Sequence, residues 1–247
     1  MPKPPRGGAR APLTVVHAGV TYRIAVKRVA SARRFTLRVR TATQDAVLTM
    51  PPRASLKTAL SFAERHAEWI GLRLSQLPAP RPIAAGARVP MRGVEHRVAH
   101  DPAALRRQPV VLPAPEASAE PRIRVGGRAE HVGAAVLGFL RREAQRDLTE
   151  AVRRHAAAVG KSIARISLRD TRSRWGSCSS RGTLSFSWRL IMAPPAVLDY
   201  LAAHEVAHLV HMDHSAAFWA VVRRLAPQTD EAEAWLKRHG PELHRYG

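Results

Sequence analysis

The sequence predicts an α+β protein in which a basic, β-rich N-terminal region precedes a helical region that carries a small antiparallel sheet. Two different patterns of apolar residues, one in each part of the 247-residue chain, support this division. Before residue 128, apolar residues alternate with arginine or lysine in several short runs, which is the period of half-buried strands. From residue 129 onward, long stretches have the period of helices. The length is sufficient for one large domain or two smaller ones.

The predicted N-terminal region starts with a tail and continues with strands. Residues 1–12 are basic and rich in proline and glycine, and they contain too few apolar side chains to order themselves. We therefore expect a disordered basic tail. Three runs then place apolar residues at alternate positions and are predicted strands: 20–29, 34–40 and 46–50.

A helix and several weaker strands complete this region. The segment 55–77 has helical periodicity, with Ser55 as its expected N-cap and Pro78 as its stop. A proline-rich linker follows, and prolines interrupt the short strand-like pieces of residues 87–125. The sequence thus predicts a β-rich basic region over residues 13–128 that contains one helix.

The region 129–247 opens with a long helical pattern that ends near Gly160, a residue suited to the left-handed conformation that closes many helices. Two strands around a Ser/Gly turn are predicted next, in "RISLRDTRSRWGSCSSRGTLSFSWRLIM". Within it, residues 183–188 alternate strictly. They form either an edge strand to which an extended peptide can add, or an interior strand that packs apolar side chains against the next helix: Leu184, Phe186 and Trp188.

A buried helix is predicted over residues 195–211, because Pro195 suits its first turn and apolar residues surround nearly all of it. One narrow strip of His, Tyr and Glu interrupts this apolar surface. Burying imidazoles and a carboxylate without partners is costly, so a shared partner is expected. His204 and His208 are one turn apart, and His-Glu-x-x-His on a helix is the signature of zinc hydrolases.

A third ligand is needed, because a catalytic zinc ion usually has three protein ligands and a water molecule. His211 lies on the same face as His204 and His208, but three ligands in a line along one helix cannot surround an ion. His214 can approach from another direction if the chain doubles back. The rival third ligands are two downstream acids, Glu231 and Glu233.

The ligand role of His214 requires a turn directly after the helix. The helix must break between His211 and His214, without a glycine to help it. His211, Met212 and Asp213 are the expected turn, since His and Asp tolerate the left-handed conformation better than most residues. Ser215 is the expected N-cap of the helix that follows.

The predicted site holds one Zn²⁺ per chain and uses Glu205 as the general base. A zinc ion lowers the pKa of a bound water molecule to about 7, and Glu205 follows the first ligand and is placed to take the proton. The candidates for stabilising the oxyanion are Tyr200, His211 and Arg174. Cys178 is either an additional, inhibitory ligand or a small residue that packs near the turn.

Two other functions remain open at this point. A nucleic-acid-binding protein with a structural zinc site would keep its function without Glu205, and its binding would fall steeply with salt. A structural protein with a fossil metal site would show neither activity nor such binding. The intact Glu205 and the lack of an obvious fourth protein ligand favour catalysis, since structural zinc sites are normally closed by four ligands.

The net charge of +21 is the unusual feature of the composition. Residues 1–128 hold 23 Lys and Arg against 7 Asp and Glu, whereas residues 129–247 hold 17 against 12. The excess in the first part suits DNA or another polyanion as a partner, although a biased genomic base composition would also enrich arginine and alanine. A single cysteine, no secretory signal and no long apolar run predict a cytoplasmic protein without a membrane segment.

The stretch 172–219 contains Trp-Gly-Ser-Cys, the His-Glu-x-x-His helix and His-Ser-x-x-Phe-Trp, and it closely resembles the YgjP-like metallopeptidases. These are bacterial relatives of the SprT-type proteases within the zincin-like group. The N-terminal strands and "VLTMPPRASL" are similar to the leading region of the family, more loosely. Asp213 departs from the Asn expected in many members, which puts the turn rather than the ligands in doubt.

The resemblance implies a zincin-like catalytic domain over residues 129–247 that hydrolyses peptide bonds in a protein or peptide substrate. It also implies that Glu205 is the catalytic residue and that three histidines bind zinc: His204, His208 and His214. Relatives of the SprT type include proteases that act on proteins crosslinked to DNA. The basic N-terminal part is compatible with such a target.

Overall fold

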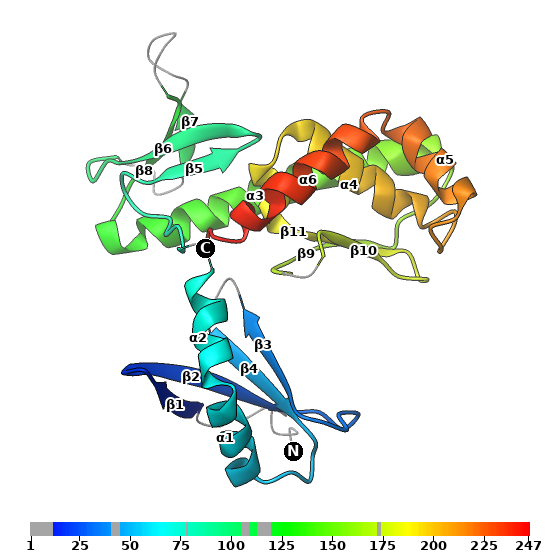
Figure 1. The fold of residues 1–247 in the computed structure, drawn as a ribbon. Coiled ribbons are helices and arrows are strands. Elements are labelled where there is room, and N and C mark those ends of the chain that lie inside the picture. Colours follow the sequence, from blue (N-terminus) through cyan, green and yellow to red (C-terminus); the bar gives the residue numbers. More distant parts are fainter. Residues whose placement is uncertain (1–11, 41–44, 78, 105–108, 113–119, 172–173) are drawn as a thin grey trace, which may run out of the picture. The chain divides into compact units, whose positions relative to one another are not determined.

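The computed structural model describes residues 12–247 except 41–44, 78, 105–108, 113–119 and 172–173. The predicted tail, apart from its last residue, and the predicted helix stop at Pro78 therefore lie outside the described residues. The chain forms two compact units, Met1–Ala79 and Pro80–Gly247 (Figure 1). Among the helices of the described part, none is long and apolar enough to cross a membrane.

The first unit is a four-stranded sheet with two helices packed on one face. Its elements are β1 (Leu13–His17), β2 (Val20–Arg28), β3 (Thr36–Arg40), β4 (Asp45–Met50), α1 (Leu56–Arg65) and α2 (Ala67–Ser75). The strand order is β1-β2-β4-β3, with β2 parallel to β4 and the other pairs antiparallel. Alternation places Ile24 and Leu48 on the inner face, where they share a core with Ile70 of α2. The sequence did not predict β1.

The predicted helix 55–77 is in fact two helices that meet at His66. Ser55 is the N-cap of α1, as predicted, and its hydroxyl accepts a hydrogen bond from the backbone N–H of Thr58 at 3.0 Å. His66 leaves the helical conformation, with φ −110° and ψ 14°. Its Nδ1 donates to the carbonyl of Phe62 at 2.8 Å, so the imidazole binds a backbone oxygen at the end of α1. Helical periodicity continues through this break, which is why the sequence pattern does not reveal it.

The second unit begins with another four-stranded sheet, which the sequence assigned to the N-terminal region. Its strands are β5 (Arg88–Met91), β6 (Val94–His100), β7 (Val110–Leu112) and β8 (Arg122–Val125), in the order β5-β6-β8-β7. The boundary between the units is therefore at residues 79/80 and not at 128/129. The physical reason is that Val98 and Ile123 of this sheet share one core with Val136 of the long helix α3 (Val132–Ala158).

The helix α3 ends as predicted and leads into a small second sheet. Gly160 follows its C-cap with φ +64°, a left-handed conformation that glycine adopts without strain. The strands are β9 (Arg165–Arg169), β10 (Gly176–Cys178) and β11 (Thr183–Ser187), in the order β10-β11-β9. The expected antiparallel sheet is in fact mixed, because β11 pairs antiparallel with β10 but parallel with β9. The strand β11 is thus the interior strand.

Four helical segments complete the second unit: η2 (Trp188–Met192), α4 (Pro195–Ala207), α5 (Ala216–Leu225) and α6 (Thr229–Leu243). The helix α4 contacts α3, α5, α6 and β10, so it lies at the centre of the unit (Figure 1). Any polar side chain on α4 must therefore be accommodated by one of these neighbours. This central helix carries the His-Glu-x-x-His motif.

Candidate active site

The helix α4 is buried on almost every side, as its apolar composition predicts. Pro195 occupies its first turn, where the missing N–H of proline costs nothing. Nine of its residues are buried, among them Leu198, Ala202 and Val206. Helix α4 ends at Ala207, four residues before the predicted end at 211, and His208 is its C-cap. The catalytic motif therefore lies at the very end of a buried helix.

The chain reverses direction between His208 and Ser215 without a left-handed residue. Positive φ among the described non-glycine residues occurs at Ala18 and Arg92, so the expected left-handed turn at residues 211–213 does not form. The last helical turn tightens instead, because the N–H groups of Leu209 and Val210 donate to carbonyls three residues earlier, both at 2.9 Å. The hydroxyl of Ser215 caps α5 as predicted, accepting from the N–H of Phe218 at 3.4 Å.

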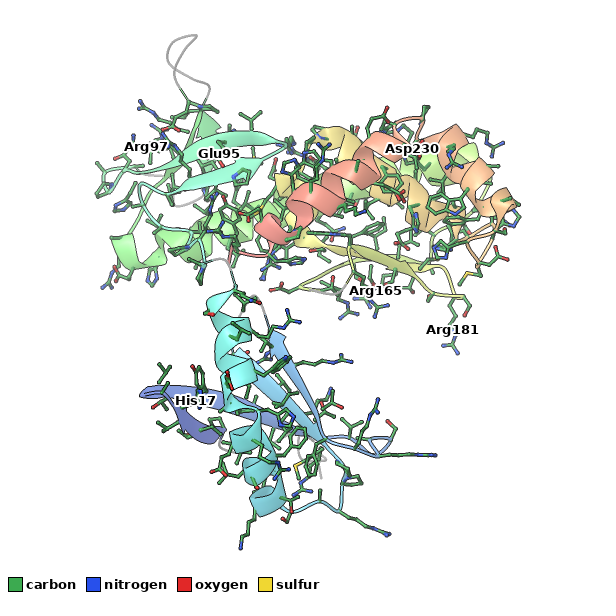
Figure 2. The ribbon with its side chains drawn as sticks, in the orientation of Figure 1. His17, Glu95, Arg97, Arg165, Arg181 and Asp230 are labelled. Carbon is green, nitrogen blue, oxygen red and sulfur yellow. The ribbon has the colours of Figure 1, made fainter. Side chains whose placement is uncertain are left out.

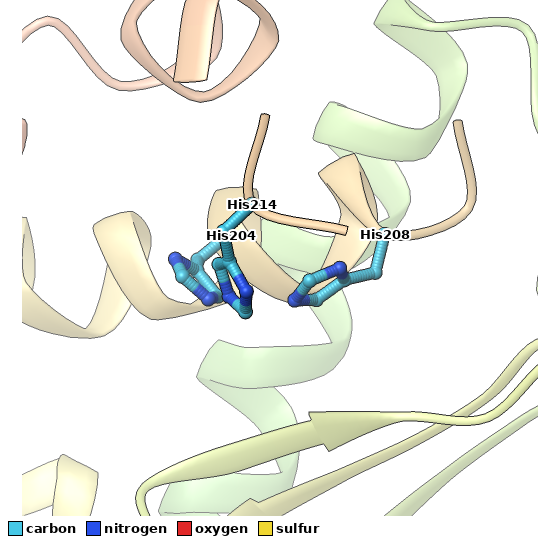
Figure 3. Close-up of side chains that lie close together, drawn as sticks. All are labelled: His204, His208 and His214. Carbon is cyan, nitrogen blue, oxygen red and sulfur yellow. The ribbon is translucent and has the colours of Figure 1, made fainter. Parts of the chain in front are cut away.

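This turn brings the three predicted ligands together (Figure 3). One nitrogen atom from each of His204, His208 and His214 lies within 4.8 Å of the other two. His204 and His208 are half-buried, whereas His214 is exposed. Burial, with added repulsion from His208 and His214, lowers the pKa of His204 to about 4, so this imidazole is neutral at pH 7. Neutral imidazole is the form that binds a metal ion.

The backbone of His211 orients one of these imidazoles. The Nδ1 of His208 donates a hydrogen bond to the carbonyl oxygen of His211 at 3.1 Å. The proton is then held on Nδ1, which leaves the lone pair of Nε2 free for a metal ion. The sequence singled out the side chain of His211, but in the structure its carbonyl group makes the contact with the site.

The hydroxyl of Tyr200 contacts a second imidazole of the cluster. It donates to Oε1 of Glu233 on α6 at 2.7 Å and lies 3.4 Å from Nδ1 of His204. Burial and the nearby Glu233 raise the pKa of Tyr200, so the phenol keeps its proton. A carboxylate, a phenol and an imidazole thus form a chain that holds the tautomer and ring orientation of His204.

Glu205 is the most confined polar group of the site. Its side chain is 4 % exposed, and Oε2 has no hydrogen-bond partner in the described part of the chain. Burial raises the pKa of Glu205 to about 7, and the positive charge of Arg174 opposes this shift. A carboxyl group that titrates near neutral pH is suited to accept and return a proton.

Gly176 of β10 makes the space that Glu205 occupies. A Cβ atom at position 176 would overlap Oε1, Cδ and Cγ of Glu205, so no larger residue fits unless the glutamate moves. The adjacent Trp175 stacks on His244 with ring centroids 4.7 Å apart, which holds the residue just before the strand. The Trp-Gly pair of the sequence motif therefore has a steric purpose that the spacing alone did not reveal.

The other predicted ligands are not part of the histidine cluster. Among the described residues, the cluster contains no Glu231, Glu233 or Cys178. Glu233 binds Tyr200 instead, which the sequence did not indicate because α6 lies far along the chain. Burial and the nearby Glu205 raise the pKa of Cys178 to about 11, so its thiol is protonated and donates weakly to the carbonyl of Ser179. Its packing agrees better with a small structural residue.

A helix that ends in His-Glu-x-x-His, a third histidine from the next turn and a buried glutamate define a metal-dependent hydrolase as the class of protein. A family model described as "YgjP-like, metallopeptidase domain" matches residues 33–239. The chain belongs to this family and is a metallopeptidase. The resemblance noted in the sequence is thereby confirmed.

Comparisons with individual proteins are less informative than the family model. No curated protein matches the chain. Among solved structures, the metallopeptidase zymogen of Pyrococcus abyssi abylysin is 18% identical, with a TM-score of 0.34, and the match covers 37% of this chain and 93% of that one. The metallopeptidase zymogen of Methanocaldococcus jannaschii jannalysin is 20% identical, with a TM-score of 0.33, and the match covers 37% of this chain and 88% of that one.

The first prediction concerns the space beside Glu205. We expect Gly176→Ala to abolish most peptidase activity, because the added methyl group displaces the carboxylate, while the metal content stays unchanged. Gly138→Ala is the matched control, since a Cβ there meets Arg142 at an ordinary 3.6 Å and alanine favours the helix. Cleavage rates and metal analysis of both variants check this. Full activity of Gly176→Ala would contradict the steric argument.

The second prediction concerns the hydrogen bonds behind His204. We expect Tyr200→Phe to weaken metal affinity roughly 10–100-fold, because outer hydrogen bonds orient and polarise a ligating imidazole. The control is Glu231→Gln, because Glu231 is exposed and lies on the same helix as Glu233. This variant should leave the metal affinity unaltered. Competition with a chelator measures both. Equal affinities for Tyr200→Phe and the unmodified protein would show that the phenol is not part of the site.

Proposed function

We propose that this metallopeptidase is a zinc endopeptidase that binds one Zn²⁺ per chain through His204, His208 and His214. The observation that carries the proposal is the convergence of three imidazole nitrogens beside a buried carboxylate that lacks a partner at Oε2. Three nitrogen ligands and an open fourth position suit catalytic zinc. When bound, the ion supplies Lewis acidity and lowers the pKa of water to about 7.

In this proposal Glu205 moves the proton. Its Oε2 takes a proton from the attacking water and later returns it to the amine that leaves the cleaved peptide bond. The tight fit against Gly176 limits the rotation of this carboxylate. Of the three candidates for oxyanion stabilisation, Tyr200 already hydrogen-bonds to Glu233, and His211 contacts the ligands through its backbone carbonyl rather than its imidazole. Arg174 adds positive charge near Glu205.

The substrate is proposed to lie along β10. The strand β11 is paired on both sides, so Thr183–Ser187 cannot accept another strand, whereas β10 is at the edge of its sheet and contacts α4. An extended peptide that adds to β10 would pass directly beside Glu205. Side chains of such a peptide alternate between the two faces of the sheet.

The third prediction separates catalysis from metal binding. We expect Glu205→Gln to lower the cleavage rate at least about 100-fold, the usual contribution of a general base, with zinc content unchanged. His214→Ala should lose both zinc and activity, whereas His211→Ala, which keeps its carbonyl contact, should retain zinc. Metal analysis and a peptide cleavage assay give the answer. Full zinc occupancy in His214→Ala would exclude it as a ligand.

The second candidate function is binding of DNA, which would direct the peptidase to DNA-associated proteins. Residues 1–79 hold 14 Lys and Arg against 3 Asp and Glu. Strand register places Arg23, Lys27 and Arg38 on the face of the first sheet that lies opposite the buried Ile24 and Leu48. All three cations are exposed and have no ion-pair partner within the described ranges, so they are available to phosphates.

The fourth prediction tests this surface. DNA affinity should fall with salt by roughly 0.9 in log–log slope per phosphate contact. We expect a triple alanine variant of Arg23, Lys27 and Arg38 to reduce this slope by roughly 3. The control removes the same charge from the helices of the same unit, at Lys57, Arg65 and Arg73. Identical losses in both triple variants would argue against a defined surface. If the Glu205→Gln variant keeps the function of the protein through DNA binding alone, the result favours a structural zinc site.

A further inference from the structure

A polar hollow lies on the small sheet β10-β11-β9, and none of the three clustered histidines lines it. It has a volume of about 280 Å³, and we call it the arginine pocket. Its walls are formed by Arg169, Thr171, Arg174, Gly176, Ser177 and Ser185. The proposed peptidase chemistry involves two residues at its border, Gly176 and Arg174, but does not use the hollow itself.

Strand register explains why these side chains gather on one face. Ser177 of β10 is opposite Ser185 of β11, which is opposite Ser167 of β9. The hydroxyls of Ser185 and Ser167 are 2.9 Å apart and hydrogen-bonded. Arg169 lies two residues after Ser167 in β9, so its side chain is on the same face of the sheet. The alternate residues, such as Leu184 and Phe186, are buried in the core. The sheet therefore has an apolar inner face and an outer face of hydroxyls and guanidinium groups.

The pocket has a net positive charge. Two arginines and three hydroxyl groups line it, and the described part of its wall contains no carboxylate. The neighbouring acid, Asp170, pairs instead with Arg189, which is 1 % exposed, and lies 3.7 Å from Arg141. Arg169 and Arg174 have no ion pair with any acid in the described part of the chain. A guanidinium fork with hydroxyl donors beside it matches a carboxylate.

The position of the pocket links it to the substrate path. Gly176 borders both sites, since it lines the pocket and also faces the side chain of Glu205. Ser177, the next residue of the edge strand, has its side chain on the outer face. If a peptide lies along β10, which rests on the proposed function, every second side chain is directed to the outer face. Such a side chain, close to the scissile bond, reaches the pocket.

We propose that the arginine pocket is a subsite for an acidic side chain of the substrate, so that the enzyme selects peptides with Asp or Glu near the cleaved bond. The carboxylate pairs with Arg169 and Arg174 and accepts hydrogen bonds from the hydroxyls. Figure 2 labels Arg165 of β9 and Arg181 of the turn between β10 and β11, which extend on the side away from the helices. They lie outside the lining of the pocket and provide matched controls.

The test uses pairs of quenched fluorescent peptides that differ by Glu or Gln at one position, scanned on both sides of the cleaved bond. With the zinc-loaded full chain, we expect the ratio of kcat/KM for Glu over Gln to be roughly tenfold or more at one position. Arg169→Ala should bring this ratio close to one, and Arg169→Glu should shift preference to a Lys peptide. Arg165→Ala, on the same strand and face, should keep the original ratio. A ratio near one at every position overturns the proposal.

A binding measurement separates this proposal from the proposed peptidase mechanism. The zinc-loaded Glu205→Gln variant should bind the Glu peptide roughly tenfold more tightly than the Gln peptide in fluorescence anisotropy, even though it does not cleave either. Equal affinities overturn the subsite whether or not the unmodified chain cleaves peptides. If Arg169→Ala weakens DNA binding and leaves the peptide ratio intact, the pocket binds phosphate and the proposal is wrong.

Discussion

The burial of α4 is the constraint on which the second unit depends. Polar groups on a helix that is enclosed on all sides must find partners within the protein. Near its start, Asp199 accepts hydrogen bonds from His155 at 2.8 Å and Gln228 at 3.1 Å, and it pairs with Arg154. His155 is itself buried in α3, so this contact joins the two helices. Oε2 of Glu205 is the exception along α4, and it lies where the chemistry is proposed.

Contacts with η2 and α3 explain why residues 80–128 belong to the same unit as α4. The hairpin between β5 and β6 donates two backbone hydrogen bonds to η2, from Arg92 to Ile191 at 2.6 Å and from Gly93 to Met192 at 3.2 Å. Arg92 has a φ of 51°, an uncommon conformation for a residue with a side chain. Its guanidinium pairs with Glu143 and Asp147 of α3, which holds this conformation in place. The hairpin therefore fixes the segment from which α4 begins.

The sequence predicted those parts of the site that depend on local spacing. His204 and His208 follow from one helical turn, and His214 follows from the need for a ligand outside that line. The partners that come from distant segments could not be predicted: Glu233 behind Tyr200, and Gly176 against Glu205. The helix end at Ala207 and the break at His66 were missed for a related reason. Both depend on backbone hydrogen bonds that hydrophobic periodicity does not encode.

The metal-binding side chains also indicate whether a bound zinc ion would be catalytic or structural. A structural site is normally closed by four protein ligands, and a buried thiolate is a frequent fourth. Here the described cluster has three imidazoles, and the nearby thiol of Cys178 is kept protonated by its burial and by Glu205. Among the described residues the cluster therefore offers three protein ligands, and a fourth coordination position would be left for water, as in catalytic zinc sites.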